Sequence, residues 1–189
     1  MDKAEPRENT LRDAFDGVVD VLATSSVPYA LIGGLAVAFH GLPRSTRDID
    51  LLWSIPRIAL PSVLEKLSQR GFTFRLDEVI RELGEDHFSR ISFHGVRVDI
   101  LEAVLPLFRG VVERAKAEAV RGRTVRVAAP GDLVALKLLA GRENDLADVK
   151  AILAAQGAKL DLEPIRRSLA ECGRQDQIET LNRLASELS

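Results

Sequence analysis

The sequence predicts an α/β (α+β) protein, with a small mixed sheet flanked by helices and a helical C-terminal portion. Two observations support this prediction. Short apolar runs with strand-like alternation occur at 28–32, 48–53 and 87–101, the pattern of a partly buried sheet. Between and after these runs, apolar residues recur every three or four positions, as on one face of a helix. We therefore expect a core over residues 1–128 and a helical portion over 129–189 that packs on it.

Four elements are expected before residue 54, in the order helix, strand, helix, strand. Asn9 or Thr10 is a suitable N-cap for the first helix, whose apolar residues recur up to Leu22. The other three are a strand at 28–32, a short helix at 35–40 that ends at Gly41, and a strand at 48–53.

The next segment is expected to contain one amphipathic helix. It follows Pro56 and runs to about Arg70, with Gly71 as its stop. A short strand is expected at 72–74, whereas the pattern of 77–86 is too mixed to assign.

A β-hairpin is the clearest signal in the middle of the chain. Two strand-like runs, 87–93 and 96–101, flank the dipeptide His94-Gly95, which is typical of a two-residue hairpin turn. In the second run Arg97 and Asp99 share one face, opposite the apolar face. Asp99 is therefore displayed on a strand that can lie beside 48–53.

The remaining elements are mostly helical. We expect an edge strand at 124–127, then a helix capped by Asp132 and another capped by Asp145. Two short helices follow residue 161, with a break around Gly173.

Composition places the chain among ordinary globular proteins. Its 189 residues are 46% hydrophobic, enough for one compact core. The net charge of −2 gives no global attraction to nucleic acid. The single Cys172 excludes an internal disulfide, and the polar start MDKAEPRENT is unlike a signal peptide. We therefore expect a cytoplasmic protein.

One uncharged stretch has the length of a membrane span. Residues 21–43 contain no Asp, Glu, Lys or Arg. However, Pro28 would break a helix in its interior, and the apolar period changes from helical to strand-like. We therefore expect no membrane span.

A local basic segment leaves two interpretations open. Residues 106–126 carry six cations and two anions, a local net charge of +4. The segment is either a solvated face with a turn at Arg121-Gly122 or a surface that contacts phosphate groups.

Asp48 and Asp50 are the residues most suggestive of chemistry. In a strand they project from the same face, and Asp99 joins them from the neighbouring strand. Three carboxylates suit a hard cation such as Mg²⁺. Without a cation, each charge raises the cost of ionising the others. Upstream, Gly33-Gly34 lies between a strand and a helix, a place where backbone approaches phosphate closely.

This arrangement suits nucleotidyl transfer from an NTP. Two Mg²⁺ ions about 3.5–4 Å apart can activate an attacking hydroxyl and stabilise the leaving pyrophosphate. We expect Asp48 and Asp50 to hold both ions and Asp99 to complete the site under the attacking oxygen. The glycine turn would hold the β- and γ-phosphates.

Two segments resemble known families. The segment GG…RSTRDIDLLW with the later VDIL, within residues 28–101, resembles the DNA polymerase β-like nucleotidyltransferase superfamily. The segment PGDLVALKLLAGRENDLADVKAIL, residues 130–153, resembles the C-terminal motif of the AbiEii-type branch, the nucleotidyltransferase toxins of bacterial toxin–antitoxin systems.

The resemblance implies roles for individual residues. Gly33 and Gly34 match the turn, and Asp48, Asp50 and Asp99 match the three metal-binding carboxylates. Lys137 and Asp148 match an additional active-site lysine and aspartate, with Lys137 near the nucleotide phosphates. Many relatives carry Ser at the position of Gly34, so a hydroxyl contact to the triphosphate is missing here.

Several residues have structural alternatives to these roles. Arg44, Thr46 and Arg47 are expected to contact the nucleotide, although the two arginines also fit solvated surface charges. Lys137 could instead extend out of a core helix to solvent, and Asp145 is read as a helix cap. His40, His87, His94 and Trp53 are interpreted as structural.

The function we expect is metal-dependent transfer of an NMP from an NTP to a hydroxyl acceptor. The branch resemblance implies an RNA acceptor, in particular a tRNA 3′ end, and a toxin-like role countered by an antitoxin protein. The alternatives are a small-molecule acceptor such as an aminoglycoside or lincosamide, a protein side chain, or a non-catalytic nucleotide-binding module of the same fold.

Overall fold

The computed structural model describes residues 8–42 and 45–188 and contains one mixed six-stranded sheet. The strand order is β3-β4-β2-β1-β6-β5. The strands are β1 (Tyr29–Ile32), β2 (Asp48–Trp53), β3 (Phe88–Phe93), β4 (Val96–Glu102), β5 (Lys116–Val120) and β6 (Arg123–Val127).

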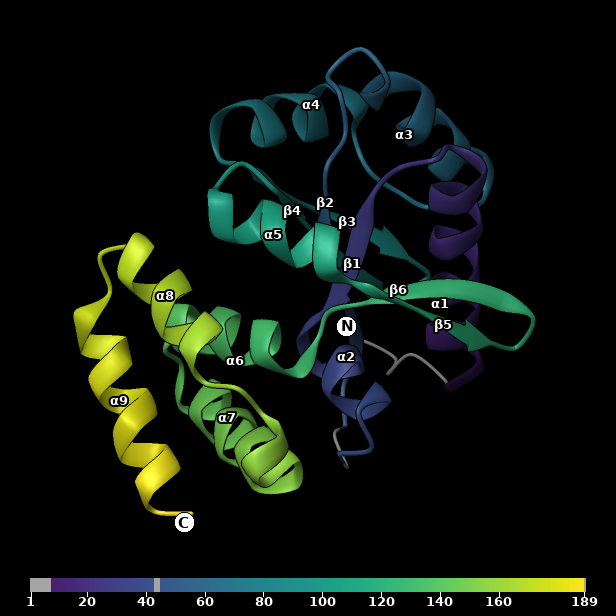
Figure 1. Ribbon diagram of the computed structural model, residues 1–189. Coiled ribbons are helices and arrows are strands. Elements are labelled where there is room, and N and C mark those ends of the chain that lie inside the picture. The colour runs from purple at the N-terminus through teal and green to yellow at the C-terminus, as the bar shows by residue number, and fades with distance from the viewer. Residues whose placement is uncertain (1–7, 43–44, 189) are drawn as a thin grey trace, which may run out of the picture.

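Helices flank this sheet and form the C-terminal portion (Figure 1). Those of the first 128 residues are α1 (Glu8–Thr24), α2 (Gly33–Phe39), α3 (Leu60–Gln69), α4 (Leu76–Glu85) and α5 (Pro106–Arg114). Those that follow are α6 (Pro130–Ala140), α7 (Glu143–Gln156), the 3₁₀ turn η1 (Gly157–Lys159), α8 (Glu163–Glu171) and α9 (Gln175–Ser186).

The predicted fold class is confirmed, and so is the hairpin. Phe93 pairs with Val96 across His94-Gly95, and both turn residues have positive φ, 45° and 85°, as a two-residue hairpin turn requires. In the C-terminal portion, the break between α8 and α9 falls at Gly173, whose φ is 68°.

Some predicted boundaries are wrong at helix starts. Asn9 and Thr10 lie inside α1 and do not begin it, and α2 starts at Gly33, two residues earlier than predicted. Asp132 does not cap α6 and Asp145 does not cap α7, because both lie inside their helices and pair with side chains from elsewhere.

Other differences concern short elements. Residues 72–74 form only an isolated bridge from Thr73 to Ser92, and the unassigned 77–86 lies largely in α4. The strand predicted at 124–127 is not an edge, since β5 covers it.

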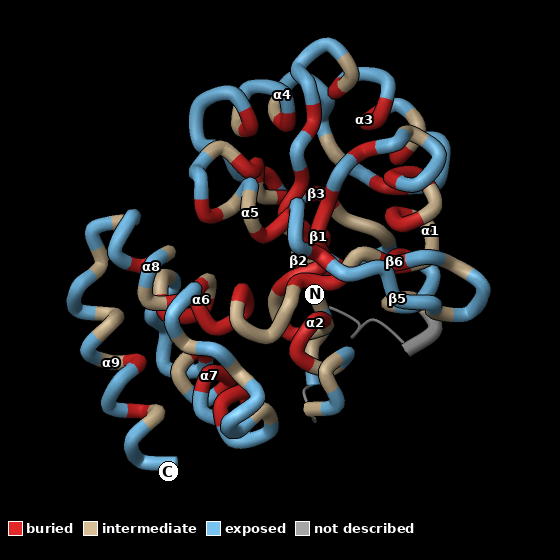
Figure 2. The backbone as a smooth tube through the Cα atoms, in the orientation of Figure 1, coloured by how far each residue is buried: buried red, intermediate tan, exposed pale blue. Residues whose placement is uncertain are grey.

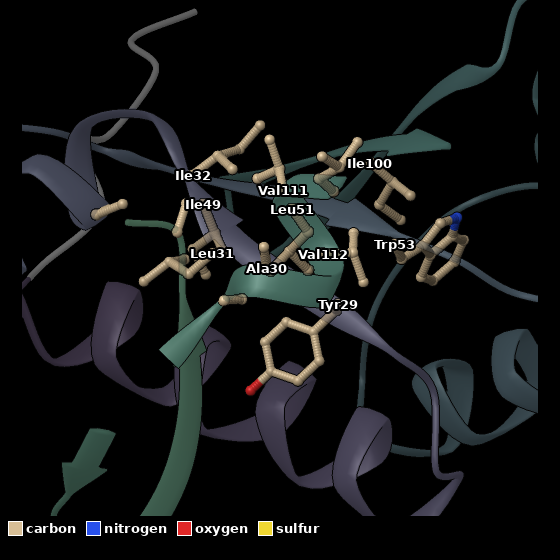
Figure 3. Packing of buried hydrophobic residues seen from close by; sticks show 14 of the residues in the cluster. Tyr29, Ala30, Leu31, Ile32, Ile49, Leu51, Trp53, Ile100, Val111 and Val112 are labelled. Atoms are coloured by element: carbon tan, nitrogen blue, oxygen red, sulfur yellow. The ribbon is translucent and has the colours of Figure 1, made fainter. Parts of the chain in front are cut away.

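The core lies around β1 and β2. All four residues of β1 are buried, so this strand is covered on both faces. Figure 3 shows Val111 and Val112 of α5 against side chains of both strands, with the fully buried Trp53 at the far end of β2. Figure 2 shows that residues of these strands and much of α6 are buried.

Helices α6 to α9 lie together to one side of the sheet (Figure 1). They are joined to it through β6, which runs parallel to β1 and leads directly into α6. The uncharged stretch noted in the sequence is divided among α1, β1 and α2. In the part of the chain that the structure describes, no helix is long and apolar enough to cross a bilayer.

Candidate functional site

The three predicted carboxylates lie side by side on the central strands. Strand β2 runs parallel to β4, with Asp50 opposite Asp99 and Asp48 opposite Arg97. Asp48 and Asp50 share a face because side chains alternate along a strand, while Ile49 between them is fully buried on the other face. The predicted convergence of Asp48, Asp50 and Asp99 is therefore present.

Asp50 lies in surroundings that disfavour its charged form. Burial, followed by the neighbouring charges of Asp99 and Asp48, raises the pKa of Asp50 to about 6. The charges of Lys137 and Arg142 act in the opposite direction. A carboxyl in such surroundings is stabilised by additional positive charge.

Position 33 requires a glycine because its backbone lies directly against the Asp50 side chain. Its φ is +66°, and a Cβ at this position would lie 1.9 Å from Oδ2 of Asp50. Neither the backbone conformation nor the space tolerates a side chain. The glycine turn therefore brings the first residue of α2 directly against the carboxylate group.

Gly34 makes room for Thr46. A Cβ on Gly34 would lie 2.9 Å from Cβ and 3.0 Å from Oγ1 of Thr46, so a serine at this position would crowd the threonine. The Thr46 hydroxyl donates to Oδ1 of Asp48 at 3.2 Å. The backbone N–H of Arg47 donates to the same oxygen at 3.2 Å. Thr46 and Arg47 thus orient Asp48.

Two arginines that the sequence analysis did not select contact the carboxylates. Arg90 of β3 donates to both oxygens of Asp99, at 2.6 and 2.7 Å. Arg97 of β4 donates to Oδ2 of Asp48. Both are cross-strand neighbours of the residues they bind. The carboxylate face is therefore flanked by positive charge on the β3–β4 side.

Lys137 lies in a buried ion-pair cluster between α6 and α7. Its ammonium group is 2.8 Å from Oδ1 of Asp145 and 2.6 Å from Oδ2 of Asp148. The Lys137 side chain is only 9% exposed, so it does not extend out to solvent. Its charge acts on Asp50, which links α6 to the carboxylate face.

The donor set suits a divalent cation, although the side chains are not arranged as a closed cage. Within residues 8–42 and 45–188, no three His, Cys, Asp or Glu side chains stand ready to hold one ion. Instead, Asp99 and Asp48 face Arg90 and Arg97. Oxygen ligands from three adjacent carboxylates nevertheless match the preference of Mg²⁺.

The other predicted residues have more local surroundings. Arg44 lies outside the described residues, so its predicted nucleotide contact stays a prediction. His40 at the end of α2 forms a hydrogen bond with the carbonyl of Ala128 at 2.8 Å. This contact ties α2 to the end of β6, as expected of a structural residue.

The basic segment is largely engaged within the chain. Arg114 pairs with Asp132 at 2.6 Å, and Arg123 pairs with Asp20 at 2.7 Å. Arg109 and Arg126 donate to backbone carbonyls. These contacts favour a structural role for most of the segment over a phosphate-contacting surface.

Comparison with solved structures shows where this fold recurs. The antibiotic-resistance factor ANT(2'')-Ia matches with a TM-score of 0.60 and 15% identity, covering 94% of this chain and 99% of that one. Its complex with adenylyl-2''-tobramycin matches with a TM-score of 0.52 and 13% identity, over 85% and 95% of the chains. A putative nucleotidyltransferase from Thermotoga maritima is 16% identical over 96% and 95%, with a TM-score of 0.48. No curated protein is significantly similar in sequence.

The fold is shared with ANT(2'')-Ia, and strands β2 and β4 carry the aspartate face on it. The chain belongs to the family described as nucleotidyl transferase AbiEii toxin of type IV toxin–antitoxin systems, whose profile matches residues 19–188, and it is therefore a nucleotidyltransferase. The match includes both segments on which the resemblance was based.

Proposed function

We propose that the protein transfers a nucleoside monophosphate from an NTP to a hydroxyl acceptor, with divalent metal ions held by Asp48, Asp50 and Asp99. The observation that supports this most directly is the parallel register that sets Asp50 beside Asp99, on the face that carries Asp48. The raised pKa of Asp50, about 6, supports it further, since such a carboxyl gains from a nearby cation.

Two Mg²⁺ ions would supply Lewis-acid stabilisation of the charge that develops on the attacking and leaving oxygens. The acceptor oxygen attacks the α-phosphorus, and the bond between the α-phosphorus and the oxygen that bridges it to the β-phosphorus breaks, so that pyrophosphate leaves. We assign Asp99 to accept the proton of the acceptor hydroxyl. Asp48 is oriented for its role by Thr46 and Arg47.

We assign the binding of the NTP polyphosphate to Lys137 and the Gly33-Gly34 turn. Asp145 and Asp148 hold the Lys137 ammonium group in place, so little side-chain entropy is lost when an anion arrives. Gly33 keeps the space beside Asp50 free of a side chain. Thr46 occupies the space beside Gly34, where a Cβ would lie 2.9 Å from the Cβ of Thr46.

For the acceptor we propose an RNA 3′ hydroxyl, in particular that of tRNA. The family is one of toxins, which fits an essential cellular target and an antitoxin partner. A single-stranded 3′ end requires few phosphate contacts, in agreement with a basic segment that is mostly engaged internally.

The test is incubation of the protein with each α-labelled NTP, Mg²⁺ and total tRNA. We expect label on tRNA and release of pyrophosphate with wild type, and neither with Asp48→Asn or Asp99→Asn. Labelling by these variants at the wild-type rate would contradict the carboxylate assignment.

A small-molecule acceptor is the second candidate. It is favoured by the similarity to ANT(2'')-Ia, a factor whose solved complex contains adenylyl-2''-tobramycin, over 94% of this chain. Parallel reactions with an aminoglycoside panel separate the two candidates. Label on aminoglycosides but not on tRNA would overturn the RNA assignment and leave the transfer reaction intact.

A further inference from the structure

The β3–β4 hairpin adds two arginines to the face that carries the catalytic carboxylates. Arg97 lies two residues before Asp99 on β4, so both project from the same face. Arg90 lies directly opposite Asp99, and Arg97 directly opposite Asp48. Both outer carboxylates of the trio are therefore bound by a guanidinium group.

These two pairs differ in character from the buried Lys137 cluster. The side chains of Arg90 and Arg97 are 49% and 53% exposed, whereas Lys137 is 9% exposed. When a half-exposed arginine leaves its carboxylate, water hydrates the guanidinium group, so breaking the ion pair costs little free energy. The same departure for Lys137 would leave buried charges unpaired.

The pairs occupy the oxygens that a cation needs. Arg90 binds both oxygens of Asp99, and Arg97 binds Oδ2 of Asp48. A metal ion that uses Asp99 and Asp48 competes with these hydrogen bonds. Once released, each guanidinium group can bind a phosphate in the bidentate manner for which arginine is suited.

We propose that Arg90 and Arg97 are exchangeable counter-ions of the metal site. They hold Asp99 and Asp48 before a divalent cation binds, and they turn to the polyphosphate of the NTP when it does. This inference rests on the proposed function of the same site. Its consequence is positive coupling: the nucleotide draws the arginines away from the carboxylates and thereby strengthens metal binding, and the metal strengthens nucleotide binding by the same factor.

The test is calorimetric titration of Mn²⁺ into the full-length protein, first without nucleotide and then with a saturating non-hydrolysable NTP analogue. Without nucleotide, Arg90→Gln and Arg97→Gln should each bind Mn²⁺ about fivefold more tightly than wild type, because the competing ion pair is gone. With the analogue, the gain in Mn²⁺ affinity should be smaller in each variant than in wild type. Arg90→Lys, which keeps the charge but loses the bidentate contact, should lie between wild type and Arg90→Gln.

Arg81→Gln is the matched control. Arg81 also forms an exposed pair, with Glu85 at 3.0 Å on α4, and its loss should leave Mn²⁺ affinity unchanged. Unfolding midpoints measured by circular dichroism establish that each variant is folded. Unchanged or weaker Mn²⁺ binding by both Gln variants without nucleotide would overturn the exchange.

Different results would contradict the metal site and the exchange of its counter-ions. Absence of Mn²⁺ binding by wild type, with and without the analogue, would overturn the proposed metal site itself. Mn²⁺ binding that is tight in wild type and insensitive to both arginines would overturn only the counter-ion inference.

Discussion

At the scale of single residues, glycine is needed at position 33 for two separate physical reasons. The positive φ disfavours any side chain, and Asp50 occupies the space where a Cβ would lie. Replacing Gly33 by Ala should therefore lower the free energy of unfolding by about 3 kcal/mol, through backbone strain and steric overlap together. The measurement is chemical denaturation, and nucleotidyl transfer should be lost as Asp50 is displaced.

The control for Gly33→Ala is a glycine with a similar φ and no neighbour. Gly122 has a φ of +78° and open space around its Cβ position. Gly122→Ala should cost only the backbone term, about 1 kcal/mol. Equal costs for the two substitutions would contradict the importance of the contact with Asp50.

The raised pKa of Asp50 predicts an unusual pH dependence of stability in the metal-free protein. Burial and two neighbouring carboxylates raise the pKa of Asp50 to about 6, above that of an unfolded aspartate. Between pH 4 and 6 the native state therefore binds more protons at Asp50 than the unfolded state, so this group's contribution to stability falls as pH rises. The loss is about 3 kcal/mol once pH exceeds 6.

Asp50→Asn tests this directly in the presence of a chelator. The variant should lack the fall in stability and should unfold at a higher denaturant concentration than wild type at pH 7, while losing transfer activity. A stability profile of Asp50→Asn that parallels wild type from pH 4 to 7 would show that Asp50 is not strained.

At the scale of elements, the α6–α7 pair is organised around one buried cation. Lys137 is shared by Asp145 and Asp148. Lys137→Met would leave two buried carboxylates without this cation and should lower the free energy of unfolding by about 3–5 kcal/mol. Thermal and denaturant unfolding measure this effect.

A triple variant separates stability from catalysis at this cluster. Lys137→Met combined with Asp145→Asn and Asp148→Asn removes all three charges and should recover most of the lost stability, since no buried charge remains unpaired. Transfer activity should stay low because the cation assigned to the polyphosphate is absent. Full activity in the stable triple variant would assign Lys137 a purely structural role.

Local patterns predicted the strands that carry the carboxylates. The contact of Arg90 with Asp99 could also have been predicted from the sequence. With His94-Gly95 as the turn, counting back along the hairpin places Arg90 opposite Asp99. The contact of Arg97 with Asp48 depends instead on the parallel pairing of β2 and β4, which joins strands more than forty residues apart and leaves no local signal.

The elements that sequence reasoning missed are short. Four of the five residues of β5 are exposed, and the apolar positions of its sequence KAEAV are small alanines before Val120, so the strand signal is weak. Helix α4 has only ten residues in a segment rich in acidic side chains, but Leu76, Val79, Ile80 and Leu83 recur at helical spacing, so the sequence did contain a signal for it. Asp132 and Asp145 resemble caps in sequence, but the tertiary partners Arg114 and Lys137 determine where their side chains lie.

At the scale of the whole molecule, the proposed site combines the two portions of the chain. The sheet contributes the carboxylates, and helices α6 and α7 contribute Lys137 and its partners. The family match likewise extends over both, from residue 19 to 188. In the proposed site the carboxylates therefore come from the sheet, whereas the buried cation Lys137 comes from the C-terminal helices.

The charge distribution of the whole chain predicts how it binds RNA. The net charge is −2, and four of the six cations in 106–126 donate hydrogen bonds within the chain. Lys116 and Arg121 are the remaining two. Each phosphate neutralised on a single strand contributes about −0.7 to the slope of log affinity against log salt. We therefore expect a slope no steeper than about −2 for single-stranded RNA.

Fluorescence anisotropy with a labelled single-stranded RNA between 50 and 300 mM salt measures this slope. A shallow slope, reduced further in Lys116→Gln with Arg121→Gln, would agree with an acceptor that engages the site through its 3′ end. A slope near −4 would show that more cations contact the phosphate backbone than Lys116 and Arg121 alone supply. Arg114→Gln distinguishes these cases, since it should change the slope only if Arg114 exchanges Asp132 for phosphate.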